Sequence, residues 1–460
     1  MSSLNEEYDS DSSTSSNESF VLTKRLLDES REDADSTLGS TTKHLVQTTS
    51  TCVPFTAYTV LTNKKRPHGG STIGRRYIHR ERNARHELII KDYFSGENSK
   101  YTAEHFRRRF RMDVELFNRI LHAIGNYNDY FTAKLDAVGK CGLSPLQKMI
   151  AALRMLAYGC PADLLDEYIQ IGESTAIESL KLFCDAIIGL FEEKYLRRPN
   201  KDDIERLLKE GEERGFPGML GSLDCMHWQW KNCPTAWHGT HRNGFKRVPT
   251  LILEAVASKD LWIWHAFFGM AGTNNDINVL NRSPLFDDII DDIAPPCNFV
   301  VQNHQYDMGY YLSDGIYPQY ATLIQTISEP STNKEKLFAK CQEAVRKDVE
   351  RAFGVLQSRW HIIKGPARMW RAKDLGKIMK TCIILHNMII ESERSQGIDP
   401  EEWIPHADER VDNINPQHDY TFLVSQMISR MKQVQHAGVH HDLKIDLINH
   451  LWEFHGGRDV

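Results

Sequence analysis

The amino-acid sequence predicts an α/β fold, in which a sheet flanked by helices follows an all-helical region and a disordered N-terminal tail. The first 40 residues hold ten acidic residues and eleven serines, which is too polar a composition to form a core. From residue 107 to about 213, apolar residues recur at intervals of three and four, as in helices. From Phe216 onward, short strand-like apolar runs and longer helical segments follow one another.

The N-terminal tail and the segment after it carry opposite charges. The 460-residue chain has a net charge of -6, but its first 40 residues hold ten acidic against three basic residues, so the remainder is slightly basic. We assign residues 1–62 to the acidic, Ser-rich tail and residues 63–106 to a basic segment. Two basic clusters in that segment are typical of a bipartite nuclear import signal: Lys64, Lys65, Arg66, Arg75 and Arg76. We expect a nuclear protein with DNA as a partner, the alternative being a solvated basic linker.

Residues 107–215 are expected to form a helical domain. The apolar positions from Phe110 to Ile124 predict one amphipathic helix. Ser144-Pro145 and Gly159 are typical start and stop signals of a second.

A helix-turn-helix is one interpretation of the segments that follow. Thr175 and Glu178 have the spacing of a capping box, which predicts a helix start. A recognition helix over 175–187 would turn Ser179 outward and place Thr175 and Lys181 against DNA. Capped helical hairpins also occur in proteins that never bind DNA, so that alternative stays open.

The strands and helices of the sheet region can be placed by length and composition. Residues 261–268 carry large side chains on both alternating faces, so we expect this strand to be covered on both sides. The expected strands are 219–230, 250–258, 261–268 and 308–313. The expected covering helices are 277–292, 334–359 and 373–394.

Three acids lie where these elements could bring them together: Asp224 in the first strand, Asp314 after the fourth, and Glu350 in the long helix. An acid in an apolar strand needs a partner or a cation, and oxygen ligands select Mg²⁺ or Mn²⁺. Asp224 could instead be a water-exposed strand-end acid, and Glu350 a surface ion-pair partner. Two residues along a helix are about 200° of rotation, so we expect Glu350 to border the buried stripe and Asp348 to lie further out.

Five runs of this region resemble the plant branch of PIF/Harbinger-type transposases, and the resemblance extends over about residues 75–394. The runs are GMLGSLDCMHWQWKNCPTAW, PTLILEAVASKDLWIWHAFFG, GTNNDINVLNRSPLF, MGYYLSDGIYP and RKDVERAFGVLQSRW.

The resemblance implies that residues 216–394 form an RNase H-like DDE nuclease domain, with Asp224, Asp314 and Glu350 as metal-binding acids. Asp276, in GTNNDIN, is either a fourth ligand or the N-cap of the next helix. With Mg²⁺ or Mn²⁺ bound, such a site would cleave and join DNA at transposon ends by two-metal in-line phosphoryl transfer. The loop after the first strand offers phosphate contacts, or is simply solvated: Lys231, His238, His241, Arg242, Lys246 and Arg247.

Hosts also retain transposases of this kind as DNA-binding or chromatin proteins, so a domesticated, non-catalytic interaction protein is the alternative. The resemblance further implies a separate Myb-like DNA-binding partner. Residues 395–460 are expected to be a partly helical extension that either packs on the nuclease domain or mediates self-association, so a homo-oligomer is an open expectation. No run of about 18 apolar residues is present, so we expect no membrane span.

Overall fold

The structure is a computed structural model that describes residues 78–135, 139, 141–244, 247–396 and 420–456, with side chains of the last segment described from residue 427. The acidic tail and the proposed import signal lie outside the described residues, as does Lys246. Residues 80–460 belong to one compact unit. None of the described helices is long and apolar enough to cross a membrane.

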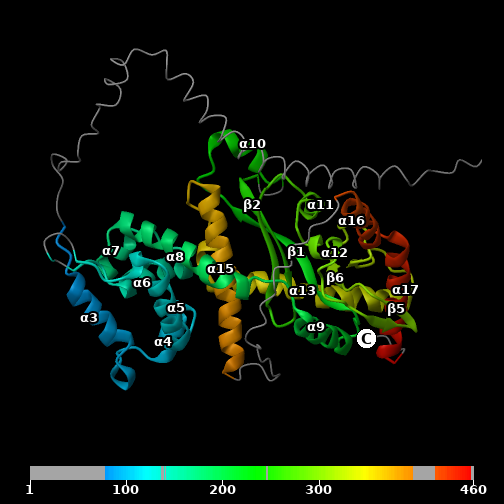
Figure 1. Ribbon diagram of the computed structural model, residues 1–460, viewed down its shortest axis with the longest axis horizontal. Helices are drawn as coiled ribbons and strands as arrows, with labels where there is room; N and C mark the ends of the chain where they lie inside the picture. Colours follow the sequence, from blue (N-terminus) through cyan, green and yellow to red (C-terminus); the bar gives the residue numbers. More distant parts are fainter. Residues whose placement is uncertain (1–77, 136–138, 140, 245–246, 397–419, 457–460) are drawn as a thin grey trace, which may run out of the picture. The chain divides into compact units, whose positions relative to one another are not determined.

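The N-terminal part of this unit is helical, as the apolar periodicity predicts (Figure 1). The Ser144 side chain and Gln147 form a capping box at the start of α6, and Gly159 ends that helix with a left-handed φ of 61°, confirming both sequence signals. The helices are α3 (Arg82–Tyr93), α4 (Ala103–Phe110), α5 (Val114–Tyr127), α6 (Pro145–Tyr158), α7 (Leu164–Ile169), α8 (Glu173–Tyr195) and α9 (Lys201–Glu213).

Two helix boundaries differ from the prediction. The helix expected from Phe110 to Ile124 is broken, because Arg111 adopts a left-handed φ of 66° and Asp113 caps a new helix by accepting the backbone N–H of Leu116. The capping box expected at Thr175 is wrong. Helix α8 begins at Glu173 after Gly172, without a side-chain cap, so Thr175 lies inside its first turn.

A mixed five-stranded sheet forms the centre of the C-terminal part, in the order β3-β2-β1-β6-β7. Strands β1, β2 and β3 are antiparallel neighbours, and β6 and β7 continue from β1 in parallel. This order is consistent with the predicted RNase H-like domain. The strands are β1 (Met219–Gln229), β2 (Thr250–Ala257), β3 (Ile263–Ala271), β6 (Tyr310–Ser313) and β7 (Leu323–Gln325), with β4 (Phe299–Val301) and β5 (His304–Tyr306) forming a separate hairpin.

The strand covered on both sides is β2, all of whose residues are buried. The prediction that residues 261–268 would be so covered is wrong, since β3 is an edge strand and only its first two residues are buried. The helix expected over 277–292 is also wrong in extent. It is two short helices, α11 (Asp276–Leu280) and α12 (Asp287–Ile290), separated at Pro284, which disfavours a helical residue before it.

The two long helices α13 and α15 pack on the sheet. Helix α13 contacts β1, β2 and β6, and α15 contacts β3 as well as α8 of the helical part. The C-terminal helix α17 packs on α13, β4 and β7, which is the packing that the sequence left open. These helices are α13 (Asn333–Arg359), α14 (His361–Lys364), α15 (Ala372–Ser395), α16 (Tyr420–Val434) and α17 (Ala437–Phe454).

Candidate functional site

The first two predicted acids come from neighbouring parallel strands. Ser222 of β1 pairs with Leu312 of β6. Continuing that register by two residues places Asp314 beside Asp224, and both side chains follow the same face of the sheet because side chains alternate. The Ser222 hydroxyl donates to the Val345 carbonyl of α13, so this face is the one that α13 covers.

Helix α13 brings Glu350 to the same place. Arg346 lies between the acids of strand and helix: one of its guanidinium nitrogens is 3.6 Å from a carboxylate oxygen of Asp224, and another is 3.0 Å from Glu350. The side chain of Glu350 is 45% exposed, as expected of a surface ion pair. A single cationic side chain therefore bridges two of the three predicted acids.

Asp224 is a carboxylate in a partly desolvated, acidic environment. Its pKa is raised from 3.8 to about 6, mainly by burial. The negative charges of Asp276 and Glu350 contribute to this rise, whereas the backbone N–H of Cys225 and the charge of Arg346 oppose it. Folding therefore brings several carboxylates close enough to repel one another.

Asp276 belongs to this group of acids and is not a helix cap. The N-cap of α11 is Asn275, whose side chain accepts the backbone N–H of Asn278, so the N-cap alternative for Asp276 is wrong. Burial raises the pKa of Asp276, and the nearby charge of Asp314 raises it too. Asp276 thus connects electrostatically with both Asp224 and Asp314.

The prediction for Asp348 is reversed. Its side chain is 3% exposed and accepts hydrogen bonds from Arg214 and Arg351, whereas Glu350 is the exposed member of the two. The rotation between them is as expected, but the buried surface extends to Asp348 because α9 and the turn after it lie over that face and supply Arg214.

The acids lie near one another, but they do not form a complete set of metal ligands. In the described part of the chain, no three His, Cys, Asp or Glu side chains are placed to hold a metal ion. The chemistry of the donor set nevertheless fits a hard divalent cation, since it consists of carboxylate oxygens and includes the desolvated Asp224. Gly354, one turn beyond Glu350, has open space where a Cβ would lie.

The loop after β1 is exposed and basic, as predicted. Lys231, Arg242 and Arg247 are exposed, and the Arg242 side chain donates to the Arg247 carbonyl at 3.0 Å. His238 is exposed, and its ring nitrogen is bonded to the carbonyl of Cys233. The ring of His241 stacks on that of Trp237.

The described helices do not show the expected helix-turn-helix. Helix α8 is 23 residues long and packs on α5, α6 and α15. Ser179, expected to point outward, is fully buried and bonded to the Tyr130 hydroxyl. The backbone carbonyl of Thr175 accepts a hydrogen bond from the Ser179 hydroxyl. Lys181 forms a 2.8 Å ion pair with Asp374 of α15.

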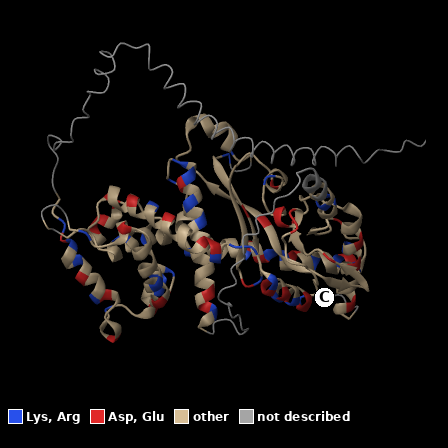
Figure 2. Ribbon diagram, in the orientation of Figure 1, with Lys and Arg blue, Asp and Glu red and all other residues tan. Residues whose placement is uncertain are grey.

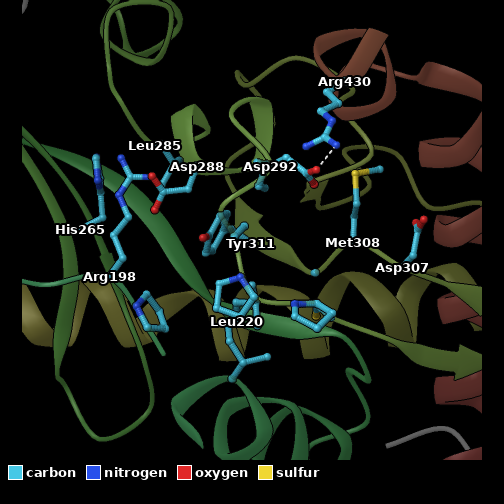
Figure 3. A pocket seen from close by; sticks show the side chains of 18 of the residues that line it. Arg198, Leu220, His265, Leu285, Asp288, Asp292, Asp307, Met308, Tyr311 and Arg430 are labelled. Atoms are coloured by element: carbon cyan, nitrogen blue, oxygen red, sulfur yellow. Dashed lines mark ion pairs between the residues drawn. The ribbon is translucent and has the colours of Figure 1, made fainter. Parts of the chain in front are cut away.

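A cavity with both polar and apolar walls lies elsewhere in the described residues. It has a volume of about 660 Å³, and the predicted acids do not line it. Ion pairs from Arg198 to Asp288 and from Arg430 to Asp292 lie at its wall, over apolar side chains such as Leu220 and Met308 (Figure 3). It does not contribute to the acid cluster.

A second buried polar group lies beside the acids and was missed from the sequence. Glu254 of β2 is fully buried, and one of its carboxylate oxygens is 3.2 Å from a ring nitrogen of His265. Cys225 contacts the Tyr317 hydroxyl at 3.5 Å. The sequence signal for a buried acid was available, because Glu254 is the single charged residue in the mostly apolar run TLILEAVA.

Comparison with known proteins finds similar sequences for much of the chain. Residues 193–397 match the model described as plant transposon protein, and residues 86–125 match a domain of unknown function. Two relatives from Arabidopsis thaliana are similar: protein ALP1-like is 25% identical over 282 residues, and protein antagonist of like heterochromatin protein 1 is 26% identical over 263.

These alignments cover 57% and 54% of this chain, and 66% and 63% of the relatives, so the chain spans less than two thirds of their length. No solved structure matches. The family match and the two relatives support the predicted resemblance to plant Harbinger-type transposases.

Proposed function

We propose that this protein is a metal-dependent DDE-type DNA endonuclease that cleaves and joins DNA strands at transposon ends, and that it acts in the nucleus. The observation that carries the proposal is the grouping of Asp224 of β1, Asp314 just after β6, Asp276 of α11 and Glu350 of α13. Of these, Asp224 and Asp276 are half-buried and the other two are exposed. Partly desolvated carboxylates that repel one another are stabilised when a cation neutralises them.

In this proposal Asp224, Asp314 and Glu350 hold the ions, and Asp276 supports them or acts as a fourth ligand. Bound Mg²⁺ or Mn²⁺ would supply Lewis-acid activation of water and of the phosphodiester. Asp224 would contribute from within the sheet, Asp314 from the end of β6, and Glu350 from the exposed side of α13. Arg346 neutralises Asp224 and Glu350 until the ions bind, and is then free to contact the DNA phosphate.

The test is cleavage of a plasmid that carries transposon terminal repeats, in Mg²⁺ or Mn²⁺, with a Myb-like partner protein supplied. Glu350→Gln is expected to lower the cleavage rate at least about a hundredfold, because catalytic acids contribute several kcal/mol to the transition state. Glu343→Gln is the matched control, since Glu343 is also an exposed acid of α13. Equal rates for wild type and Glu350→Gln would exclude the assignment of Glu350.

A second candidate function is a domesticated DNA- or chromatin-associated protein. Two observations favour it: one relative is named for antagonism of a heterochromatin protein, and Arg346 already neutralises two of the acids. DNA binding with no cleavage in Mg²⁺ or Mn²⁺, by wild type and Arg346→Ala alike, would favour this candidate.

A further inference from the structure

Two exposed tryptophans lie beyond the end of β1. Trp237 is 46% exposed and Trp370 is 65% exposed, and the other described tryptophans are buried or half-buried. Two exposed indole rings near one strand end offer apolar surface that a ligand could cover. Their neighbours indicate which ligand that is.

A single buried residue, Trp230, anchors both. Its ring lies against that of Trp237 with centroids 5.8 Å apart. Its indole N–H donates to the carbonyl of Met369 at 2.9 Å, so Trp370 follows directly on that anchor. The ring of Trp237 and the backbone next to Trp370 thus both contact Trp230 at the end of β1.

The segment that carries Trp370 is held rigidly by its backbone. The indole of Trp228 donates to the Gly365 carbonyl, the N–H of Lys231 to Ala367, and the amide of Asn232 to Arg368. Trp237 is stacked on His241 with an angle of 15° between the rings. Because the Trp237 ring is already ordered, it loses little conformational entropy when a ligand binds, whereas at Trp370 it is the backbone that is preordered.

The surroundings of the rings are strongly basic. Residues 231–249 and 361–373 together contain eight Lys or Arg and no Asp or Glu. The described ones are all exposed, and none is ion-paired with another described residue: Lys231, Arg242, Arg247, Lys364, Arg368, Arg371 and Lys373. Figure 2 shows Lys and Arg gathered where α15 begins.

We infer that Trp237 and Trp370 form a base-stacking platform that binds unpaired nucleotides of DNA, with the surrounding Lys and Arg on the phosphates. Exposed aromatic faces within a basic groove are how proteins bind single strands, since each base offers a π face that a duplex hides. A duplex would use only the cations. The inference deepens the proposed function by naming strand-separated DNA as its ligand.

The position suits that role. Trp230 is six positions along the chain from Asp224, which is about 20 Å at the rise of a strand. That distance is about six nucleotides of a stacked strand at 3.4 Å per step, and fewer if the unpaired strand is extended. Nucleotides unpaired near the cleaved bond could therefore reach the platform while the bond lies at the acids.

The test measures binding of the full chain to a fluorescein-labelled 20-mer oligo(dT) and to a 20-base-pair duplex by anisotropy. EDTA is present, so that binding does not depend on metal or cleavage. Trp237→Ala and Trp370→Ala are each expected to weaken oligo(dT) binding about five- to 150-fold, the effect of losing one stacked base. Trp→Phe variants should restore most of the affinity, and duplex binding should change less.

Phe454→Ala is the control, because Phe454 is an equally exposed aromatic residue on α17. The inference is overturned if the tryptophan variants bind oligo(dT) as tightly as Phe454→Ala does, or if the duplex loses as much affinity as the single strand. Thermal melting of each variant separates misfolding from loss of stacking. If wild type never cleaves DNA but the tryptophan effect is present, the platform stands and only the nuclease proposal fails.

Discussion

The middle and the end of β1 carry opposite charges in opposite environments. At Asp224 the strand lies under α13, and the charges near it are those of other carboxylates and of Arg346. In residues 231–249 and 361–373, the described charges are exposed cations with no ion-pair partner among the described residues, and each segment carries one exposed indole.

The contrast shows how burial decides what a charge does. A desolvated carboxylate changes the stability of the fold and the affinity for a cation. An exposed cation adds little to stability, but it attracts polyanions. Each side of this comparison can be perturbed separately.

The largest effect is expected on the buried side, at Asp348. Removing it leaves Arg214 partly buried without its carboxylate, so Asp348→Ala should lower the free energy of unfolding by about 3–5 kcal/mol. Glu350→Ala, on the same helix but exposed, should change it by about 0.5 kcal/mol or less. Urea denaturation measures both, and similar losses for the two would refute the assigned difference in burial.

The exposed side should respond to salt. If oligo(dT) binding neutralises about four phosphates, raising the salt from about 50 to 200 mM should weaken it about 50-fold. The double variant Arg242→Gln, Arg371→Gln should reduce the slope of log affinity against log salt by about 1.4.

Lys209→Gln, on α9 and paired with Glu213, serves as the control and should leave that slope unchanged. A double variant with the wild-type slope would place the bound strand elsewhere on the protein.

Much of the fold was predictable because it depends on local signals. Ser144-Pro145 and Gly159 defined α6 to the residue, and the apolar runs placed β1, β2 and β6. Long-range packing was not predictable. Residues 261–268 looked doubly buried, yet they form an edge strand, since strand order is not encoded in the alternation of side chains.

The site shows the same limit. The positions of Asp224, Asp314 and Glu350 along the chain followed from the sequence and the family resemblance. The burial of Asp348 depends on Arg214, 134 residues away, and no periodicity reports such a partner. The position of Trp370 near the end of β1 likewise depends on contacts between the 365–371 segment and that strand end, which the sequence pattern does not report.

The smallest effect concerns Asp224 and follows from its raised pKa. The folded pKa of about 6 lies above the unfolded value of 3.8, so the folded state holds the proton more tightly. Wild-type stability therefore falls as pH rises from about 4 to 6, and the penalty is complete above that range. Asp224→Asn should raise the free energy of unfolding by about 1–3 kcal/mol at pH 7.5 and by nearly nothing at pH 3.5. Urea denaturation at both pH values, in EDTA, measures the difference.

Mg²⁺ at pH 7.5 should then stabilise wild type but not the Asp224→Asn variant, because only the carboxylate binds the ion. A gain that is equal at both pH values would mean that repacking, rather than an uncompensated charge, separates the two proteins.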